Sequence, residues 1–287
     1  MYKVVAKYGK SKSDCKTEVA FHREEISAIV ATAETESFLK DKKYPFVAVT
    51  REKIELSCSN LVIELGRMCN MNCEHCLRGH SENAEISLDD AAYAIKMFDS
   101  INSITFTGGE PVLYQEKIIQ IVELILALDV PISSFYIASN GTPPSQELLF
   151  ALCKLYAHCD DKEFCRYEAS KDRWHDFPEF PDWMSAFSFV GERGDISEAS
   201  LINEGNAYEN GIGNRHLNHS KEFYYDEDYG EVDLLYVNSF GELLADCDYS
   251  YETQREIDSF SLDDIRSGAV TPQEVFVKTF KESSEEE

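Results

Sequence analysis

No stretch of this sequence stays apolar for the roughly 18 to 20 residues that a membrane-spanning helix requires. The first seven residues, MYKVVAK, also lack the apolar core of a secretory signal peptide. Together these two absences predict a protein that has no membrane partner and resides in the cytoplasm.

Basic residues are scarce as well. The chain has 27 lysines and arginines against 53 aspartates and glutamates, which gives a formal net charge of −26 at pH 7. Because a protein that binds the nucleic-acid backbone needs a basic surface, we expect no general nucleic-acid binding. An acidic surface would favour a basic partner such as a basic peptide, although good solvation alone also explains it.

The cysteine pattern gives no indication of a disulfide framework. Nine cysteines in a chain of 287 residues without a signal peptide indicate metal binding or catalysis instead. Three of them, Cys69, Cys73 and Cys76, are spaced C-x3-C-x2-C shortly after the apolar run LVIEL at 61–65. Soft thiolate ligands of this kind suit iron–sulfur clusters, zinc or copper(I).

Two kinds of metal site are consistent with this loop. A [4Fe–4S] cluster normally takes four cysteines, so three would leave one iron open to a small molecule. The alternative is a zinc site in which His75 or His80 supplies the fourth ligand. His75 lies between two of the cysteines, so His80 has the better spacing for this role. A cluster predicts a reaction centre, whereas zinc predicts a stabilised binding module.

The cysteine spacing resembles the signature of the radical S-adenosylmethionine (SAM) enzymes. In that family three cysteines hold a [4Fe–4S] cluster, and the open iron chelates SAM, which is cleaved reductively to a 5′-deoxyadenosyl radical. The resemblance implies that Cys69, Cys73 and Cys76 are the cluster ligands and that the cofactors are the cluster and SAM. His75 occupies a position that is usually aromatic in the family and lies near the adenine, and an imidazole is planar enough to stack there.

Two later segments extend the resemblance. Gly108, Gly109 and Glu110 follow a predicted strand at 103–106, where adjacent glycines let the backbone approach a ligand closely. They match the Gly-Gly-Glu element of the family, which binds the amino group of SAM. Ser139 and Asn140 follow a predicted strand at 134–138, and the resemblance implies that they bind the ribose or the methionyl carboxylate. An ordinary Asn-Gly turn is the alternative reading of this second segment.

Polar residues also follow the fourth predicted strand, at 163–169. The segment from Ser170 to His175 resembles an S-x-D-x-aromatic-H element of some family members. This implies that Ser170 and Asp172 bind cofactor and that Trp174 and His175 face the substrate, which makes His175 a candidate catalytic residue. Cys247 is a second candidate, as a hydrogen-atom donor; the alternatives are a lone metal ligand and, ahead of both, an ordinary buried thiol.

The order of predicted elements indicates the fold class. From residue 61 onward strands and helices alternate, which predicts a parallel sheet with crossover helices. With the resemblance, this predicts an α/β fold, an incomplete (β/α)6 partial TIM barrel at 59–251. Residues 1–58 predict a small β-rich appendage, which serves either as a substrate-recognition module or as a lid. Residues 252–287 predict C-terminal helices and an acidic tail.

The resemblance implies an enzyme that cleaves SAM and abstracts hydrogen from a substrate. A peptide is the first candidate substrate, as in the modification of ribosomally made natural-product precursors, and a small metabolite or nucleotide is the alternative. An external electron donor such as flavodoxin or ferredoxin is the expected protein partner. A zinc-stabilised binding module without enzymatic activity is the competing class of function.

Overall fold

The computed structural model describes residues 2–22, 25–53, 55–175, 182–194, 197–217, 223, 225–226, 230–270 and 275. The chain divides into two compact units. The first comprises Met1–Leu56 and Asp226–Gly230, and the second comprises Ser57–Tyr225 and Glu231–Glu287. Residues 252–270 thus belong to the second unit, and the predicted acidic tail lies outside the described residues.

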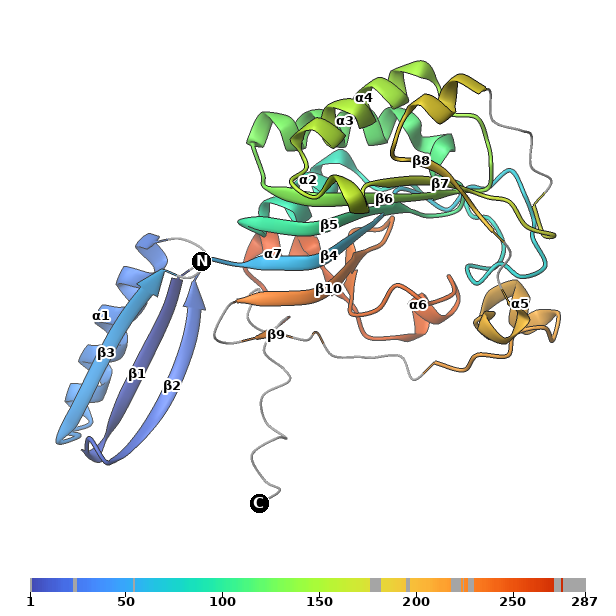
Figure 1. Cartoon of the computed structure of the whole chain (residues 1–287). Coiled ribbons are helices and arrows are strands. Elements are labelled where there is room, and N and C mark those ends of the chain that lie inside the picture. Colours follow the sequence, from blue (N-terminus) through green and yellow to red (C-terminus); the bar gives the residue numbers. More distant parts are fainter. Residues whose placement is uncertain are drawn as a thin grey trace. The chain divides into compact units, whose positions relative to one another are not determined.

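The first unit is a three-stranded antiparallel sheet with one helix. Strands β1 (Tyr2–Ser11), β2 (Asp14–His22) and β3 (Phe46–Lys53) pair in the order β2-β1-β3. Helix α1 (Glu25–Asp41) packs against the sheet, where Ala28 and Leu39 are buried with Val4 and Ala6 of β1 (Figure 1). The predicted β-rich appendage is therefore confirmed.

The second unit is built on a parallel sheet. Its strands pair in the order β12-β11-β10-β4-β5-β6-β7-β8, and β9 pairs with β10. Within it, β10 and β4 to β8 run parallel to one another. Strand β11 pairs antiparallel with both of its neighbours, β10 and β12. The strand bounds are β4 (Ser57–Glu64), β5 (Ser100–Thr107), β6 (Ile132–Ser139), β7 (Arg166–Ser170), β8 (Val190–Arg193), β9 (Tyr225–Asp226), β10 (Glu231–Val237), β11 (Glu242–Leu244) and β12 (Phe260–Ser261).

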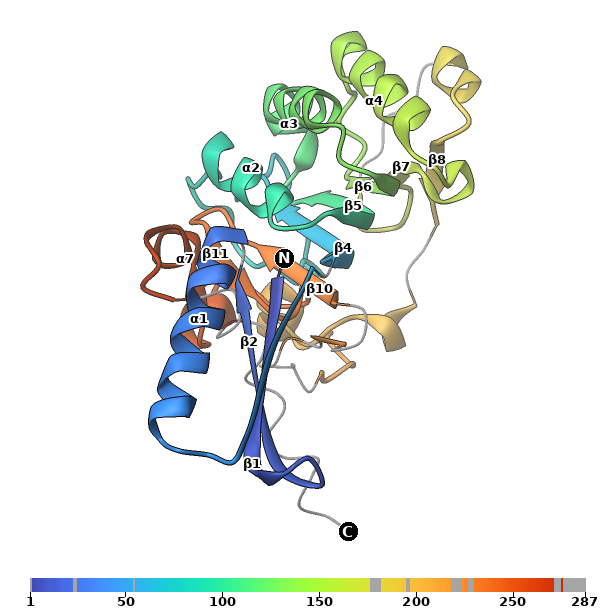
Figure 2. The same cartoon turned by 90° about the vertical axis from the view of Figure 1, so that its left-hand side faces the viewer.

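Three helices cover one face of this sheet, as Figures 1 and 2 show: α2 (Leu88–Lys96), α3 (Gln115–Leu128) and α4 (Gln146–His158). Ser87 and Ser145 cap α2 and α4 by accepting hydrogen bonds from the backbone N–H groups of Asp90 and Leu148. The remaining helical segments are short. They are η1 (Pro111–Tyr114), η2 (Lys162–Phe164), η3 (Asp182–Ala186), η4 (Glu198–Ser200), α5 (Gly205–Glu209), α6 (Thr253–Glu256) and α7 (Leu262–Ser267).

Among the described strands, β8 and β10 do not pair with each other, so the sheet stays open. Parallel strands that alternate with helices and leave the sheet unclosed form a partial barrel. The predicted fold class is therefore confirmed.

Side chains of the parallel strands alternate between two faces. One set is fully buried toward the helices, and includes Ile104 and Phe106 of β5 and Phe135 and Ile137 of β6. The alternating set points to the interior of the open barrel, and its last members line a cavity: Thr107, Ala138, Ser170 and Arg193. This alternation decides which strand-end residues reach the cavity.

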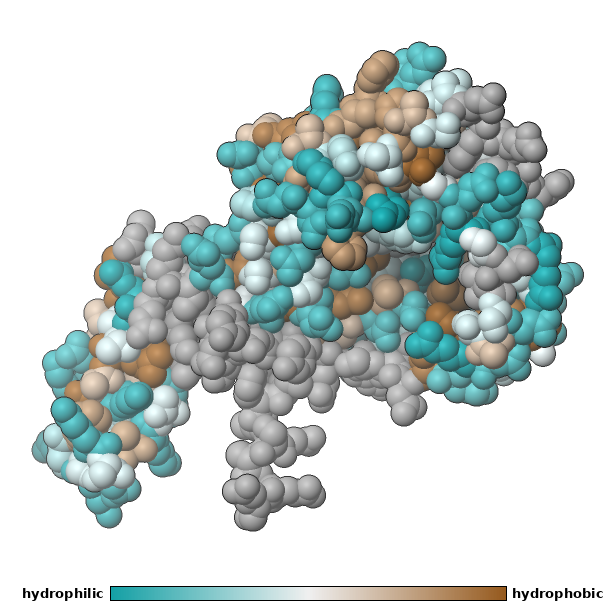
Figure 3. All heavy atoms as spheres, in the orientation of Figure 1, coloured by the Kyte–Doolittle hydropathy of each residue, from teal (hydrophilic) through white to brown (hydrophobic). Residues whose placement is uncertain are grey.

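Within the part of the chain that the structure describes, no helix is both long and apolar enough to cross a membrane. Hydrophilic residues cover much of the face seen in Figure 3, with an apolar area over α3 and α4. Leu128 of α3 and Phe150 of α4 are exposed apolar side chains of these helices.

Candidate functional site

The three-cysteine loop follows β4 at the carboxyl end of the sheet. All three thiols are half-buried and none is in a disulfide. Asn206 at the start of α5 holds the loop, because its backbone N–H donates to the Cys76 carbonyl and its side-chain amide donates to the Cys73 carbonyl, both at 2.9 Å. Burial raises the pKa of Cys69, and it raises the pKa of Cys73 to about 11.

A small cavity lies against this loop. All three cysteines line it, together with Gly109, Arg78 and other residues. The three cysteines of the loop therefore share one small cavity.

The Gly-Gly-Glu turn packs directly on the start of the loop. The Gly109 N–H donates to the Gly66 carbonyl and the Glu110 N–H donates to the Met68 carbonyl, both at 2.9 Å. A Cβ on Gly108 would lie 2.1 Å from the Gly66 oxygen, and Gly108 has a φ of +143°. Only glycine is compatible with this close approach of two backbones.

We predict that Gly109→Ala displaces the cysteine loop, because its Cβ would lie 2.2 Å from the Met68 carbonyl oxygen. The expected result is a loss of about 1–3 kcal/mol of stability and a lower iron content per chain. Gly194→Ala is the matched control, since nothing lies within 4 Å of its added Cβ. Thermal unfolding and iron analysis measure both effects, and an unchanged melting temperature and iron content in Gly109→Ala would contradict the prediction.

The Glu110 carboxylate is buried and connects two strand ends. It accepts hydrogen bonds from the Val112 N–H, from the Ser139 hydroxyl at 2.8 Å and from the Asn140 N–H at 2.7 Å. Burial raises the pKa of Glu110, and these hydrogen bonds oppose that shift. Glu110 and Ser139 thus position the turn and do not line either cavity.

Asn140 is placed differently from Ser139. Its side-chain amide donates to the side-chain oxygen of Asn70 at 2.8 Å and lies 3.7 Å from the Cys69 sulfur. The third predicted strand end therefore touches the cysteine loop itself.

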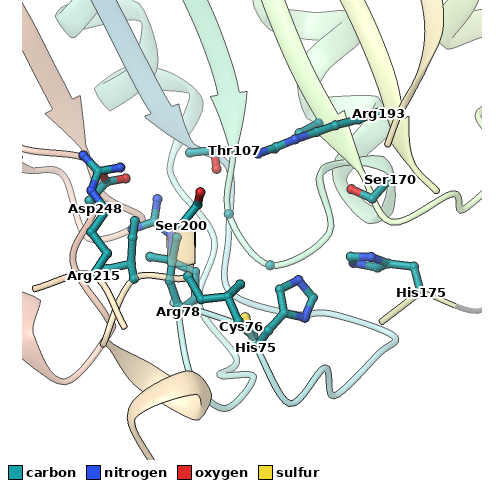
Figure 4. Close-up of a pocket in the computed structure, with 16 residues that line it drawn as sticks. His75, Cys76, Arg78, Thr107, Ser170, His175, Arg193, Ser200, Arg215 and Asp248 are labelled. Atoms are coloured by element: carbon teal, nitrogen blue, oxygen red, sulfur yellow. The ribbon is translucent and has the colours of Figure 1, made fainter. Parts of the chain in front are cut away.

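A second and larger cavity of about 510 Å³ opens beside the loop (Figure 4). Six residues singled out from the sequence line it: His75, Cys76, Gly108, Gly109, Ser170 and His175. Cys76, Arg78 and Gly109 line both this cavity and the smaller one. The cysteine loop and the large cavity thus form one continuous site.

His75, Asp172, Trp174 and His175 form an aromatic and acidic cluster at this cavity. The His75 ring stacks on Trp174 with a centroid distance of 5.0 Å and meets the His175 ring edge-on at 5.2 Å. The His175 Nδ1 lies 2.7 Å from an Asp172 carboxylate oxygen. Burial lowers the pKa of His75 to about 4. Burial opposes ionisation of Asp172, but the hydrogen bond from His175 prevails and lowers its pKa.

Cys247 lies away from both described cavities. Its side chain packs against the buried cluster of Val62, Tyr236, Leu244 and Tyr249, and burial raises the pKa of its thiol to about 12. The neighbouring residue, Asp248, lines the large cavity instead. The catalytic role of Cys247 stays a prediction.

Six polar residues of the cavity wall were not singled out from the sequence: Arg78, Thr107, Arg193, Ser200, Arg215 and Asp248. Two of them stand beside recognised motifs, since Arg78 follows Cys76 by two residues and Thr107 directly precedes Gly108. Their positions next to these motifs were the signal by which the sequence could have identified Arg78 and Thr107. The other four come from segments that carry no motif of their own.

A buried ion pair fixes the start of the loop. The Arg67 guanidinium donates to Glu64 at 2.7 Å, to Glu82 at 3.0 Å and to the Gln254 side chain at 2.5 Å. Glu64 and Arg67 are 0% and 1% exposed, and the guanidinium lies over the Tyr251 ring. This network connects the end of β4 with α6, and so supports the start of the cysteine loop.

An open parallel barrel gathers three thiols, a glycine turn and a cavity at its carboxyl end, which is the edge where barrels of this kind place their chemistry. Residues 63–160, a segment that includes these thiols and the glycine turn, match the family model described as "Radical SAM superfamily". This segment of the chain is therefore identified as a radical SAM domain, a class that uses a [4Fe–4S] cluster and SAM. The match supports an enzyme, as the cysteine spacing predicted.

Several solved structures are similar at low identity. BtrN in complex with AdoMet and 2-DOIA is 17% identical with a TM-score of 0.41, and the match covers 68% of this chain and 75% of that chain. SuiB from Streptococcus suis bound to the precursor peptide SuiA is 13% identical with a TM-score of 0.41, covering 90% and 73%. Native anSMEcpe with bound AdoMet and the Cp18Cys peptide is 12% identical with a TM-score of 0.34, covering 68% and 75%.

These structural likenesses, at TM-scores below 0.5, add nothing to the assignment, which rests on the family match. No curated protein matches the chain at a significant level.

Proposed function

We propose that Cys69, Cys73 and Cys76 hold a [4Fe–4S] cluster and that SAM binds in the adjoining 510 Å³ cavity. The bound cofactors supply the 5′-deoxyadenosyl radical that abstracts hydrogen from the substrate. The observation that carries the proposal is that Cys76 and Gly109 line both cavities. A molecule in the large cavity is thereby within reach of a metal centre in the small one.

The spacing of the thiols supports a cluster over a single zinc ion. Tetrahedral zinc with Zn–S bonds of about 2.3 Å places its sulfur ligands about 3.8 Å apart. Among the described residues, Cys69, Cys73 and Cys76 do not form a group whose sulfurs all lie within 4.8 Å of one another. A multi-iron cluster takes each thiolate on a different iron, and so accommodates wider spacing.

Unpaired buried atoms around the cavity support the binding of a polar cofactor. The His75 Nδ1 and the Asp172 Oδ2 are buried without a hydrogen-bond partner. An unsatisfied buried polar atom typically costs about 1–3 kcal/mol, which a bound ligand recovers. We infer that His75 and Asp172 contact SAM, with Ser170 beside them in the cavity.

The protein contributes positioning and exclusion of water in this proposal. Gly108 and Gly109 bring backbone to the cavity wall without side chains. Glu110 and Ser139 hold that backbone in place, and Asn140 lies next to the Cys69 sulfur. His175, oriented by Asp172, faces the cavity as the proposed catalytic side chain nearest the substrate.

A peptide is the first proposed substrate, because the acidic chain, with a net charge of −26, suits a basic leader segment. The second candidate is a small anionic metabolite or nucleotide. Three arginines on the cavity wall favour it: Arg78, Arg193 and Arg215. The proposed electron donor is a flavodoxin or ferredoxin, and the proposed location is the cytoplasm.

The test is anaerobic incubation of the reconstituted protein with SAM and dithionite, with 5′-deoxyadenosine read by mass spectrometry. We expect the product to form even without substrate, at a slow uncoupled rate. Stoichiometric zinc, together with absence of iron, sulfide and 5′-deoxyadenosine, would instead establish the zinc-stabilised binding module.

A further inference from the structure

Half of the arginine side chains in the described part of the second unit are paired with acids. Arg67 pairs with Glu64 and Glu82, Arg173 with Glu198, Arg255 with Glu82, and Arg266 with Asp90 and Asp263. This is the expected outcome in a chain with about twice as many acidic as basic residues. An arginine without an acidic partner is therefore informative in this protein.

The three arginines that line the large cavity are among those without such a pair, as is Arg166, which lies outside the cavity. Within the described part of the chain, Arg78, Arg193 and Arg215 form no ion pair with a carboxylate. Arg78 donates to the Tyr249 backbone carbonyl at 2.7 Å, and its charge also interacts with the buried Glu64 carboxylate. Because a guanidinium stays ionised at any physiological pH, Arg193 and Arg215 bring to the cavity two positive charges that no ion pair among the described residues neutralises.

One acid, Asp248, lies on the same wall. Figure 4 shows it beside Arg215, but no ion pair joins these two described residues. The wall of the cavity is thus cationic in a chain whose net charge is −26.

The backbone positions of two of these arginines are fixed. The Arg215 N–H donates to the Leu201 carbonyl at 2.8 Å, and the Arg215 carbonyl accepts from Asn203 at 2.9 Å. Arg193 is the last residue of β8, where its carbonyl accepts from Lys171 at 2.7 Å. Two anchored arginines with exposed side chains are therefore presented to one cavity.

Figure 4 shows Arg193 reaching across the cavity toward Thr107, and Arg215 on the other side near Ser200. Cys76, His75 and Arg78 lie between and below them in this view. A molecule in the cavity therefore meets a guanidinium on each side, while the cysteine loop forms the floor.

We propose that the substrate of this enzyme carries a carboxylate or phosphate group and that Arg215, assisted by Arg193, binds it. The planar guanidinium matches both anions through paired hydrogen bonds. The inference rests on the proposed function for the reaction, but the anion site stands on the arginine arrangement alone. Of the two proposed substrate classes, it favours the small anionic metabolite or nucleotide.

The closing experiment titrates the reconstituted, SAM-saturated protein anaerobically with inorganic phosphate, malonate and malonamide, by calorimetry. We expect phosphate or malonate to bind and the uncharged malonamide not to bind. Arg215→Gln should weaken the affinity for the anion at least tenfold, and Arg193→Gln should weaken it several-fold. Arg266→Gln, which removes a surface charge on α7, is the matched control and should leave the affinity unchanged.

The two anions separate the two chemistries, because preference for phosphate indicates a phosphorylated substrate and preference for malonate a carboxylic acid. Absence of binding by both anions, or equal binding by wild type and Arg215→Gln, overturns the proposal. Uncoupled 5′-deoxyadenosine formation is measured in parallel. Arg215-dependent anion binding without any SAM cleavage would refute the proposed function and leave the anion site standing.

Discussion

Replacing Cys69, Cys73 and Cys76 together by alanine is expected to abolish both the bound iron and the cleavage of SAM. Each thiol lines the small cavity at the loop, so the triple variant leaves no sulfur donor there. Without thiolate ligands no [4Fe–4S] cluster is held, and without the cluster no electron reaches SAM. The measurements are iron and sulfide per chain, visible absorbance, and 5′-deoxyadenosine by mass spectrometry, which should fall to background.

Cys153→Ala is the matched control for the loss of a thiol. Cys153 is a partly buried cysteine on α4, outside the loop and both described cavities. This variant should keep its iron and its activity. A triple variant that retains iron and sulfide would show that the cluster lies elsewhere and would refute the proposed ligand set.

Arg67→Met is expected to lower the free energy of unfolding by about 3–5 kcal/mol, because it leaves the buried Glu64 carboxylate without its ion-pair partner. Both side chains are essentially inaccessible to solvent, and the Nε–Oε1 distance is 2.7 Å. The lost guanidinium also leaves the Gln254 side chain without its donor. Urea unfolding followed by circular dichroism measures the change.

Two further variants make this result specific. Lys171→Met breaks the exposed pair with Glu192, whose partners are each about half exposed, and should cost less than about 1 kcal/mol. Glu64→Gln combined with Arg67→Met removes the buried charge along with its partner and should recover part of the loss. If Arg67→Met alone costs no more than Lys171→Met, the ion pair does not stabilise the fold as argued.

Local patterns predicted the parts of the site that are continuous in sequence. The C-x3-C-x2-C spacing and the Gly-Gly-Glu turn identified the family, and the structure brings them together through hydrogen bonds to Gly66 and Met68. Helix caps at Ser87 and Ser145 were equally local, since each depends on residues within one turn.

Features that depend on distant segments were not visible in the sequence. Arg193 and Arg215 belong to a strand and to a loop, and only the folded sheet brings both to one cavity. Helix α1, from Glu25 to Asp41, lies in the part of the chain for which the sequence predicted a β-rich appendage. Its apolar residues occur on both faces, since Ile29, Val30 and Phe38 are exposed while Ala28 and Leu39 are buried, which hides the helical period.

The contact between Arg67 and Gln254 joins residues 187 positions apart in the chain. During synthesis on the ribosome, Arg67 emerges long before its partner exists, so the segment that precedes the cysteines has no complete support until the segment with Gln254 has been made. Insertion of iron and sulfide at the proposed site should accordingly follow the synthesis and docking of α6.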